Sequence, residues 1–96
     1  MITRQSIQQR RDEILEVARR YGAHDMRIFG SVARGDQRED SDLDLVVRFE
    51  PDRSLFDHGG LICDLEELLD VKVDVVSEGG MREQFRLYIE KEAVAL

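Results

Sequence analysis

The residues FGSVARGDQREDSDLDLVV, at positions 29–47, carry the strongest structural signal in this 96-residue chain. Met26–Phe29 is a short and partly apolar run that ends at Gly30. This pattern is typical of a buried strand that leads into a tight turn. Ser31 is then expected to act as the N-cap of a helical turn that Gly35 ends. Backbone N–H groups at such a junction point outward, so the pattern indicates a binding place for an anion such as a triphosphate.

A pair of carboxylates lies at the other end of these residues. Leu43–Phe49 is apolar at nearly every position and predicts a strand, with Asp42 and Asp44 two residues apart on one face. Neighbouring carboxylates repel each other unless a cation or a proton intervenes, and Mg²⁺ is the cation usually held by carboxylates together with substrate phosphates. Taken alone, such a pair is more often a solvated acidic corner than a metal site.

A third carboxylate, Asp74, interrupts the next strand-like run, Val71–Val76. A lone carboxylate in an apolar strand is costly unless it is hydrogen-bonded, paired or bound to metal. If this strand lies beside the previous one, Asp74 faces Asp42 and Asp44. Three carboxylates would then bracket two divalent ions about 3.5–4 Å apart, one activating the attacking oxygen and one holding the triphosphate.

Together, the residues at 29–35, 41–44 and 73–75 resemble the signature of the polymerase-beta-like nucleotidyltransferases. The short chain resembles the minimal members of that family, the MNT domains. This resemblance implies an α/β (α+β) fold in which helices pack against a small mixed β-sheet. It also implies one minimal nucleotidyltransferase domain over residues 1–96.

The family's activity is the transfer of a nucleoside monophosphate from a nucleoside triphosphate to an acceptor hydroxyl, with release of pyrophosphate. Carried over by position, the resemblance implies that Gly30 and Ser31 bind the triphosphate. It implies that Asp42 and Asp44 are catalytic metal ligands. Asp74 would be the third catalytic and metal-ligating carboxylate, on the acceptor side.

Other polar residues near these motifs have weaker assignments. Arg34 falls where the family carries a basic residue, and we expect it to contact the nucleotide. A surface charge paired with nearby acidic residues is an equally good interpretation of Arg34. For Arg38, the surface charge is the better interpretation. Ser41 is expected to cap or orient the aspartates. His24 and His58 lack metal-ligand spacing and are expected to be structural or surface residues.

MNT domains resemble the antitoxin halves of prokaryotic two-gene toxin–antitoxin modules, whose other half is a helical HEPN-domain ribonuclease. The resemblance therefore implies AMP transfer from ATP to a tyrosine of a HEPN toxin, with two Mg²⁺ ions and a hetero-oligomer with the toxin. Two alternatives stay open. One is a non-catalytic antitoxin that neutralises its partner by binding alone, and the other is nucleotidyl transfer to a small molecule or an RNA end.

Composition limits the remaining function classes. The net charge is −7, from fourteen basic and twenty-one acidic residues, which argues against direct nucleic-acid binding. No signal-like start and no apolar run near twenty residues is present, so no membrane association is expected. The single cysteine, Cys63, allows no internal disulfide, fits a reducing cytoplasm and is expected to be packed among apolar neighbours.

The remaining pattern predicts three longer helices and an apolar tail. A serine–aspartate capping box precedes the middle helix, and a Gly-Gly pair inside that helix is expected to mark its start, a kink or a close contact. Its apolar residues, including Leu55 and Phe56, are expected to be core. These segments are the helix Arg4–Tyr21, the helix that follows Ser54 and runs to about Leu69, the helix Met81–Glu92, and the tail Ala93–Leu96, expected as a short strand or a partner surface.

Overall fold

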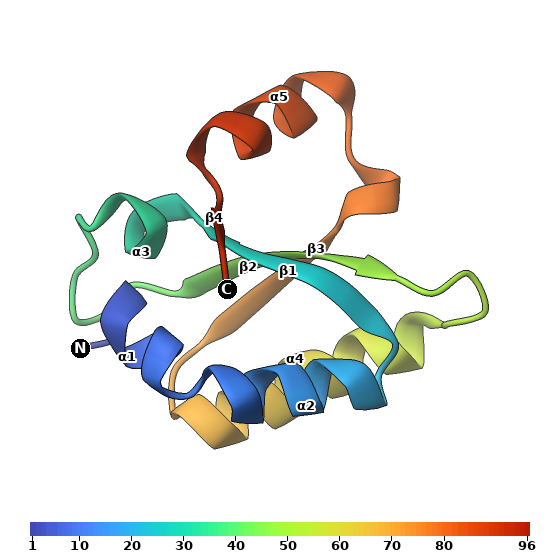
Figure 1. Ribbon diagram of the computed structural model, residues 1–96, viewed down its shortest axis with the longest axis horizontal. Coiled ribbons are helices and arrows are strands. Elements are labelled where there is room, and N and C mark those ends of the chain that lie inside the picture. Colours follow the sequence, from blue (N-terminus) through green and yellow to red (C-terminus); the bar gives the residue numbers. More distant parts are fainter.

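Four strands form one mixed sheet in the order β3-β2-β1-β4 in the computed structural model, which describes residues 1–96 (Figure 1). β1 pairs antiparallel with β2 and with β4, and β2 pairs parallel with β3. The parallel pair is joined by a crossover helix, as parallel pairing requires. The predicted α/β class with a mixed sheet is therefore confirmed. The strands are β1 (Ala23–Phe29), β2 (Leu43–Phe49), β3 (Val73–Ser77) and β4 (Val94–Ala95).

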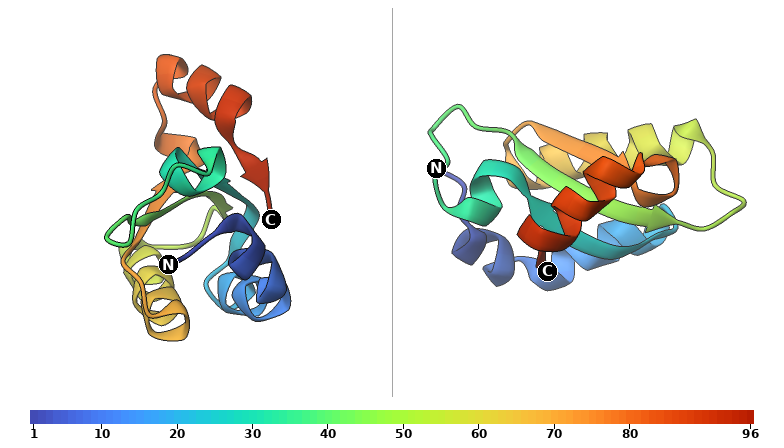
Figure 2. Two further views of the ribbon diagram at one scale, coloured as in Figure 1. Left: turned by 90° about the vertical axis from the view of Figure 1, so that its left-hand side faces the viewer. Right: turned by 90° about the horizontal axis from the view of Figure 1, so that it is seen from above.

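Helices cover both faces of this sheet (Figures 1 and 2). One face is packed by α1, α2 and α4, while α5 lies over the other face. The short α3 lies at the end of the sheet where β1 stops. The helices are α1 (Arg4–Gln9), α2 (Arg11–Arg20), α3 (Gly30–Arg34), α4 (Leu55–Leu69) and α5 (Glu83–Glu92), and a 3₁₀ turn, η1 (Glu78–Gly80), precedes α5.

The alternation along β2 divides its side chains between two apolar clusters. Leu43 and Leu45 are buried with the helices α1, α2 and α4 in the larger cluster. Val46 points the other way and packs with Phe29 and with Ile89 of α5. Because side chains alternate along a strand, Asp44 shares the face of Val46 and therefore lies on the α5 side of the sheet.

The predicted N-terminal helix over Arg4–Tyr21 is wrong in its continuity, because the chain bends at Arg10 into α1 and α2. The guanidinium of Arg10 donates a 2.7 Å hydrogen bond to the carbonyl of Leu68 near the end of α4 and pairs with Glu13. The bend lets this side chain satisfy a carbonyl that the end of a helix leaves free. A contact between residues 58 positions apart thus sets the bend.

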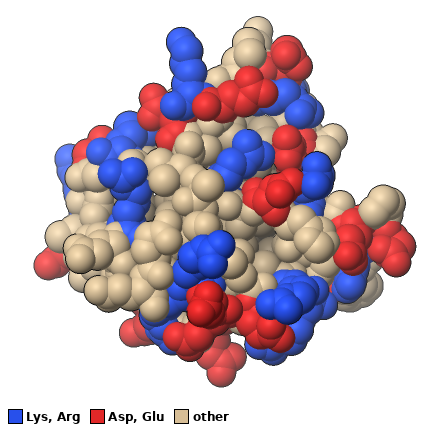
Figure 3. All heavy atoms as spheres, in the orientation of Figure 1, with Lys and Arg blue, Asp and Glu red and all other residues tan.

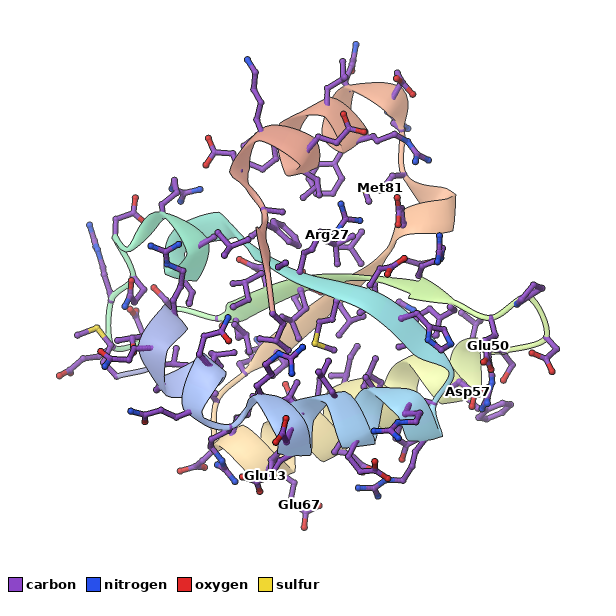
Figure 4. All side chains as sticks on the ribbon, viewed as in Figure 1. Glu13, Arg27, Glu50, Asp57, Glu67 and Met81 are labelled. Carbon is purple, nitrogen blue, oxygen red and sulfur yellow. The ribbon has the colours of Figure 1, made fainter.

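The N-terminus of α4 has the predicted capping box, in which Ser54 and Asp57 exchange hydrogen bonds. Arg53 lies 3.0 Å from Glu50 and 3.4 Å from Asp57, and these two acids lie near each other at the end of the sheet remote from Gly30 (Figure 4). The loop between β2 and α4 is therefore held by local polar contacts.

Two predictions about burial in α4 are wrong. Leu55 and Phe56 are 86% and 90% exposed, and Cys63 is exposed as well. The buried face of the helix is set by Leu61 and Leu65. Phe56 lies five residues before Leu61, so a helix with 3.6 residues per turn directs it away from that face.

The Gly-Gly pair makes a close contact at only one of its two positions. A Cβ on Gly60 would overlap the ring of Tyr21, whereas a Cβ on Gly59 would meet nothing within 4 Å. We expect Gly60→Ala to lower the free energy of unfolding by about 1–3 kcal/mol through overpacking. Gly59→Ala is the matched control and should raise it by about 0.5–1 kcal/mol through helix propensity. Urea denaturation checks both values, and equal effects of the two substitutions would contradict the contact.

The C-terminal segment agrees with the prediction except at its start. α5 begins at Glu83 and not at Met81, because η1 extends the turn that follows β3. The tail forms β4, in which Val94 and Ala95 pair with Ile28 and Arg27. None of the helices has both the length and the apolar character needed to cross a membrane.

Candidate active site

Asp44 occupies the centre of the candidate site because β2 lies between β1 and β3. Its partner across the antiparallel pair is Phe29, the last residue before Gly30, and its partner across the parallel pair is Asp74. The register thus brings the glycine turn and two of the three predicted carboxylates side by side. The expectation that Asp74 lies beside the Asp42–Asp44 pair is confirmed for Asp44.

Gly30 is required at the start of α3 for two separate reasons. Its φ of +73° lies in the left-handed region, which residues with a Cβ rarely adopt. A Cβ at this position would also overlap the carboxylate of Asp44. The glycine therefore lets the β1–α3 turn approach Asp44 closely, and the free N–H groups at the first turn of α3 start beside this carboxylate.

Ser31 is not the N-cap that the sequence predicts. α3 begins one residue earlier, at Gly30, and Phe29 is its N-cap without a side-chain hydrogen bond. The left-handed conformation of Gly30 allows the helix to start directly from the strand. Gly35 ends the helix as predicted, with a φ of +82°.

Burial and the neighbouring charges of the site change the pKa of Asp44. Burial raises the pKa of its carboxyl above the usual value, and the negative charges of Asp74 and Asp42 raise it further. The positive charge of Arg34 acts in the opposite direction. None of the three aspartates forms an ion pair, although most of the protein's arginines do. The site therefore has an excess of negative charge that a cation would neutralise.

The raised pKa predicts a pH-dependent effect of Asp44→Asn on stability. Because folding favours the protonated carboxyl, ionisation of Asp44 costs stability as the pH rises through its folded-state pKa. Asparagine stays neutral, so we expect the variant to unfold at a higher temperature than the wild type at about pH 7. At about pH 3, below the ordinary pKa, the two should be nearly equal. Calorimetry at the two pH values checks this, and a difference independent of pH would contradict it.

The predicted cluster of three metal-ligating carboxylates is not formed in this structure. No group of three or more His, Cys, Asp or Glu side chains is arranged to hold a metal ion. Asp42 and Asp74 are exposed, and mutual repulsion favours conformations in which such side chains point apart. The donor set still fits Mg²⁺, because this ion is typically bound through one or two carboxylates with water and substrate phosphates completing its shell.

Arg34 lies at the end of α3 and joins this site to α5. Its Nε donates to Asp36 at 3.1 Å, and its Nη1 donates to the hydroxyl of Tyr88 at 3.0 Å. Asp36 raises the pKa of the Arg34 guanidinium, so the group stays cationic. Nothing in the sequence indicates this contact of Tyr88, because it joins residues 54 positions apart.

The hydrogen bonds of the other polar residues named from the sequence go to partners other than the three aspartates. Ser41 accepts a hydrogen bond from the backbone N–H of Arg38 at 2.7 Å, so it closes the loop before β2. His24 lies 3.0 Å from Glu50, and the ring of His58 lies 2.7 Å from the carbonyl of Val75. The structural and surface roles expected for the two histidines are confirmed. Acidic and basic side chains alternate over the face seen in Figure 3.

Residues 11–95 match the family model described as the nucleotidyltransferase domain, which includes the glycine turn and all three aspartates. The chain belongs to the nucleotidyltransferase domain family. This nucleotidyltransferase domain is 35% identical over 79 residues to the protein adenylyltransferase MntA of Thermococcus cleftensis, covering 82% of this chain and 80% of that one. The family predicted from the sequence is thereby confirmed.

Solved structures agree with this assignment. One described provisionally as a minimal nucleotidyltransferase is 47% identical, with a TM-score of 0.89, and the match covers 99% of this chain and 97% of the other. A chain in the structure of a tri-AMPylated Shewanella oneidensis HEPN toxin in complex with MNT antitoxin matches with a TM-score of 0.70. That match is 18% identical and covers 92% of this nucleotidyltransferase domain and 69% of the other chain, so it shows a shared fold.

Proposed function

We propose that this chain is a Mg²⁺-dependent adenylyltransferase that moves AMP from ATP to a tyrosine hydroxyl of a partner HEPN-domain toxin and thereby acts as its antitoxin. The observation that carries the proposal is the position of Asp44, with the Gly30 turn on one side and Asp74 on the other. An anion-binding turn beside unpaired carboxylates suits a substrate that carries both phosphate and a divalent cation.

Each residue of the site has a defined role in the proposed reaction. The backbone N–H groups of Gly30 and Ser31 bind the triphosphate, while Asp42 and Asp44 hold the cation. When bound, Mg²⁺ would neutralise the phosphate charge and polarise the α-phosphate. Asp74 accepts the proton of the acceptor hydroxyl. The acceptor oxygen forms a bond to the α-phosphorus as the bond to pyrophosphate breaks.

The relatives support both the reaction and the acceptor. The MntA relative is named a protein adenylyltransferase, and an MNT antitoxin of the same fold occurs in complex with an AMPylated HEPN toxin. We therefore assign ATP as the nucleotide substrate and a HEPN toxin as the partner in a hetero-oligomer. Because ATP is the proposed substrate, we expect the reaction to take place in the cytoplasm.

Neutralisation by binding alone is the second candidate. It is favoured by Leu55 and Phe56, two large apolar side chains that are almost fully exposed and would gain from burial against a partner. A purely binding antitoxin has no physical need for two unpaired carboxylates, Asp44 and Asp74, beside a glycine turn. The catalytic hypothesis explains this feature and is preferred.

Pyrophosphate release is the experiment that distinguishes the two candidates. The wild-type chain is mixed with ATP, Mg²⁺ and its co-expressed HEPN partner, and pyrophosphate is measured over time. The Asp42→Asn/Asp44→Asn double variant is the control. We expect release that needs both the partner and the two aspartates. If the partner is neutralised without any pyrophosphate release, the binding hypothesis replaces the catalytic one.

A further inference from the structure

Side chains of α5 contact the residue just before α3 and the last residue of α3. Before the first residue of α3, the ring of Phe29 meets the ring of Phe85 edge-on, with centroids 5.7 Å apart and an angle of 83°. At the last residue, Arg34 donates its 3.0 Å hydrogen bond to the hydroxyl of Tyr88. Phe85 and Tyr88 stack on each other with centroids 6.0 Å apart. A continuous row of aromatic rings thus runs alongside the glycine turn and ends at the arginine.

The contacts of Arg34 fix its direction without using all its donors. A guanidinium has five N–H donors, of which Asp36 receives one from Nε and Tyr88 one from Nη1. The remaining three are free to bind phosphate oxygens, which match the planar fork of arginine. Arg34 ends the five-residue helix that Gly30 begins, so it lies about one helical turn from the glycine turn that would bind the triphosphate.

The helix that carries Tyr88 is anchored independently of this hydrogen bond. Ile89 is buried against the sheet, and β4, which follows α5, pairs with β1. Arg27, which lies between the sheet and α5 (Figure 4), is 3.1 Å from Glu78, and Glu78 is 3.6 Å from Arg86 of α5. A hydroxyl on such a fixed element restrains the long arginine side chain before the nucleotide binds. The side chain then loses less rotational freedom on binding.

We propose that Tyr88 is a positioning residue that orients Arg34 for the phosphates of a bound nucleoside triphosphate. This inference rests on the proposed function and adds to it a residue from α5, outside the glycine turn and the aspartates. Tyr88 acts only through Arg34. Removal of its hydroxyl should therefore weaken nucleotide binding when Arg34 is present and have no further effect when it is absent.

The test is a double-substitution cycle in which ATP binding in the presence of Mg²⁺ is measured by isothermal titration calorimetry. Tyr88→Phe keeps the ring and its stacking on Phe85 but removes the hydroxyl. We expect its Kd for ATP to rise about fivefold to tenfold, as for the loss of one ordinary hydrogen bond. Arg34→Gln should weaken binding at least as much, and adding Tyr88→Phe to it should change nothing more. Leu87→Ala, an exposed neighbour on α5, is the matched control and should bind ATP as the wild type does.

Each outcome of the cycle has one meaning. An unchanged Kd for Tyr88→Phe overturns the positioning role while leaving the proposed function intact. So does an equal weakening by Tyr88→Phe in the presence and absence of Arg34, because a purely structural role of Tyr88 would give that result. Melting temperatures of the variants separate such loosening of α5 from the specific effect. Failure of the wild-type chain to bind ATP would overturn both the proposed function and this inference.

Discussion

Asp44→Asn should reduce the initial rate of AMP transfer by about a thousandfold or more. Asp44 is the residue at which the two neighbouring strands place Gly30 and Asp74, so the amide removes negative charge from the centre of the site. Asparagine has the same size as aspartate, and no hydrogen bond or ion pair of the fold depends on the Asp44 carboxylate, so folding should be preserved. Incorporation of label from ATP labelled at the α-phosphate into the HEPN partner measures the rate.

The matched control for this substitution is Asp52→Asn. Asp52 is exposed in the loop between β2 and α4, at the end of the sheet remote from the site, so the same chemical change there should be harmless. The variant should transfer AMP at the wild-type rate. A rate for Asp44→Asn within about tenfold of the wild type would contradict the central role of this carboxylate, since loss of a metal ligand costs more than that.

Gly30→Ala should give the second largest effect, a rate of AMP transfer lower by about a hundredfold or more together with a loss of about 1–3 kcal/mol of stability. The added Cβ meets two obstacles, the left-handed φ of +73° and the carboxylate of Asp44. Relief of that overlap moves either the turn or the aspartate, and both belong to the site. The rate is measured as for Asp44→Asn, and stability is measured by urea denaturation.

Gly35→Ala distinguishes the effect of backbone strain from the effect of the overlap with Asp44. Gly35 has a φ of +82°, but a Cβ there would meet nothing within 4 Å. It should therefore lose stability through backbone strain alone and keep most of its activity. If the two glycine variants lost activity to the same extent, the close approach of Gly30 to Asp44 would have no catalytic meaning.

The sequence predicted the parts of this fold that depend on local pattern. The apolar run of β2 is bounded by polar residues on both sides, and its predicted limits, Leu43 and Phe49, agree with the structure. Alternation placed Asp42 and Asp44 on one face of the first strand, and the similar run around Asp74 predicted a second strand, whose pairing with the first was a condition that the structure meets. The family signature covered these same residues, so the sequence pattern named the residues that the structure brings together at the candidate site.

The features that sequence reasoning missed depend on contacts between distant parts of the chain. Arg10, at the bend, donates to a carbonyl of α4, and the hydrogen bond between Arg34 and Tyr88 requires α5 to lie beside α3. Phe56 is exposed because another face of α4 packs against the sheet. The apolar content of the helix alone does not define that face. The N-cap was wrongly predicted at Ser31 because the left-handed Gly30 starts the helix one residue early.

The central claim is that this chain silences its partner by covalent AMP transfer, and intact-protein mass spectrometry of the HEPN partner tests it most directly. The partner is weighed after incubation with ATP, Mg²⁺ and either the wild-type chain or the Asp42→Asn/Asp44→Asn variant. We expect the wild-type chain to add the mass of one or more AMP groups to the partner and the variant to add none. A partner of unchanged mass that both forms still bind and inhibit would contradict the claim.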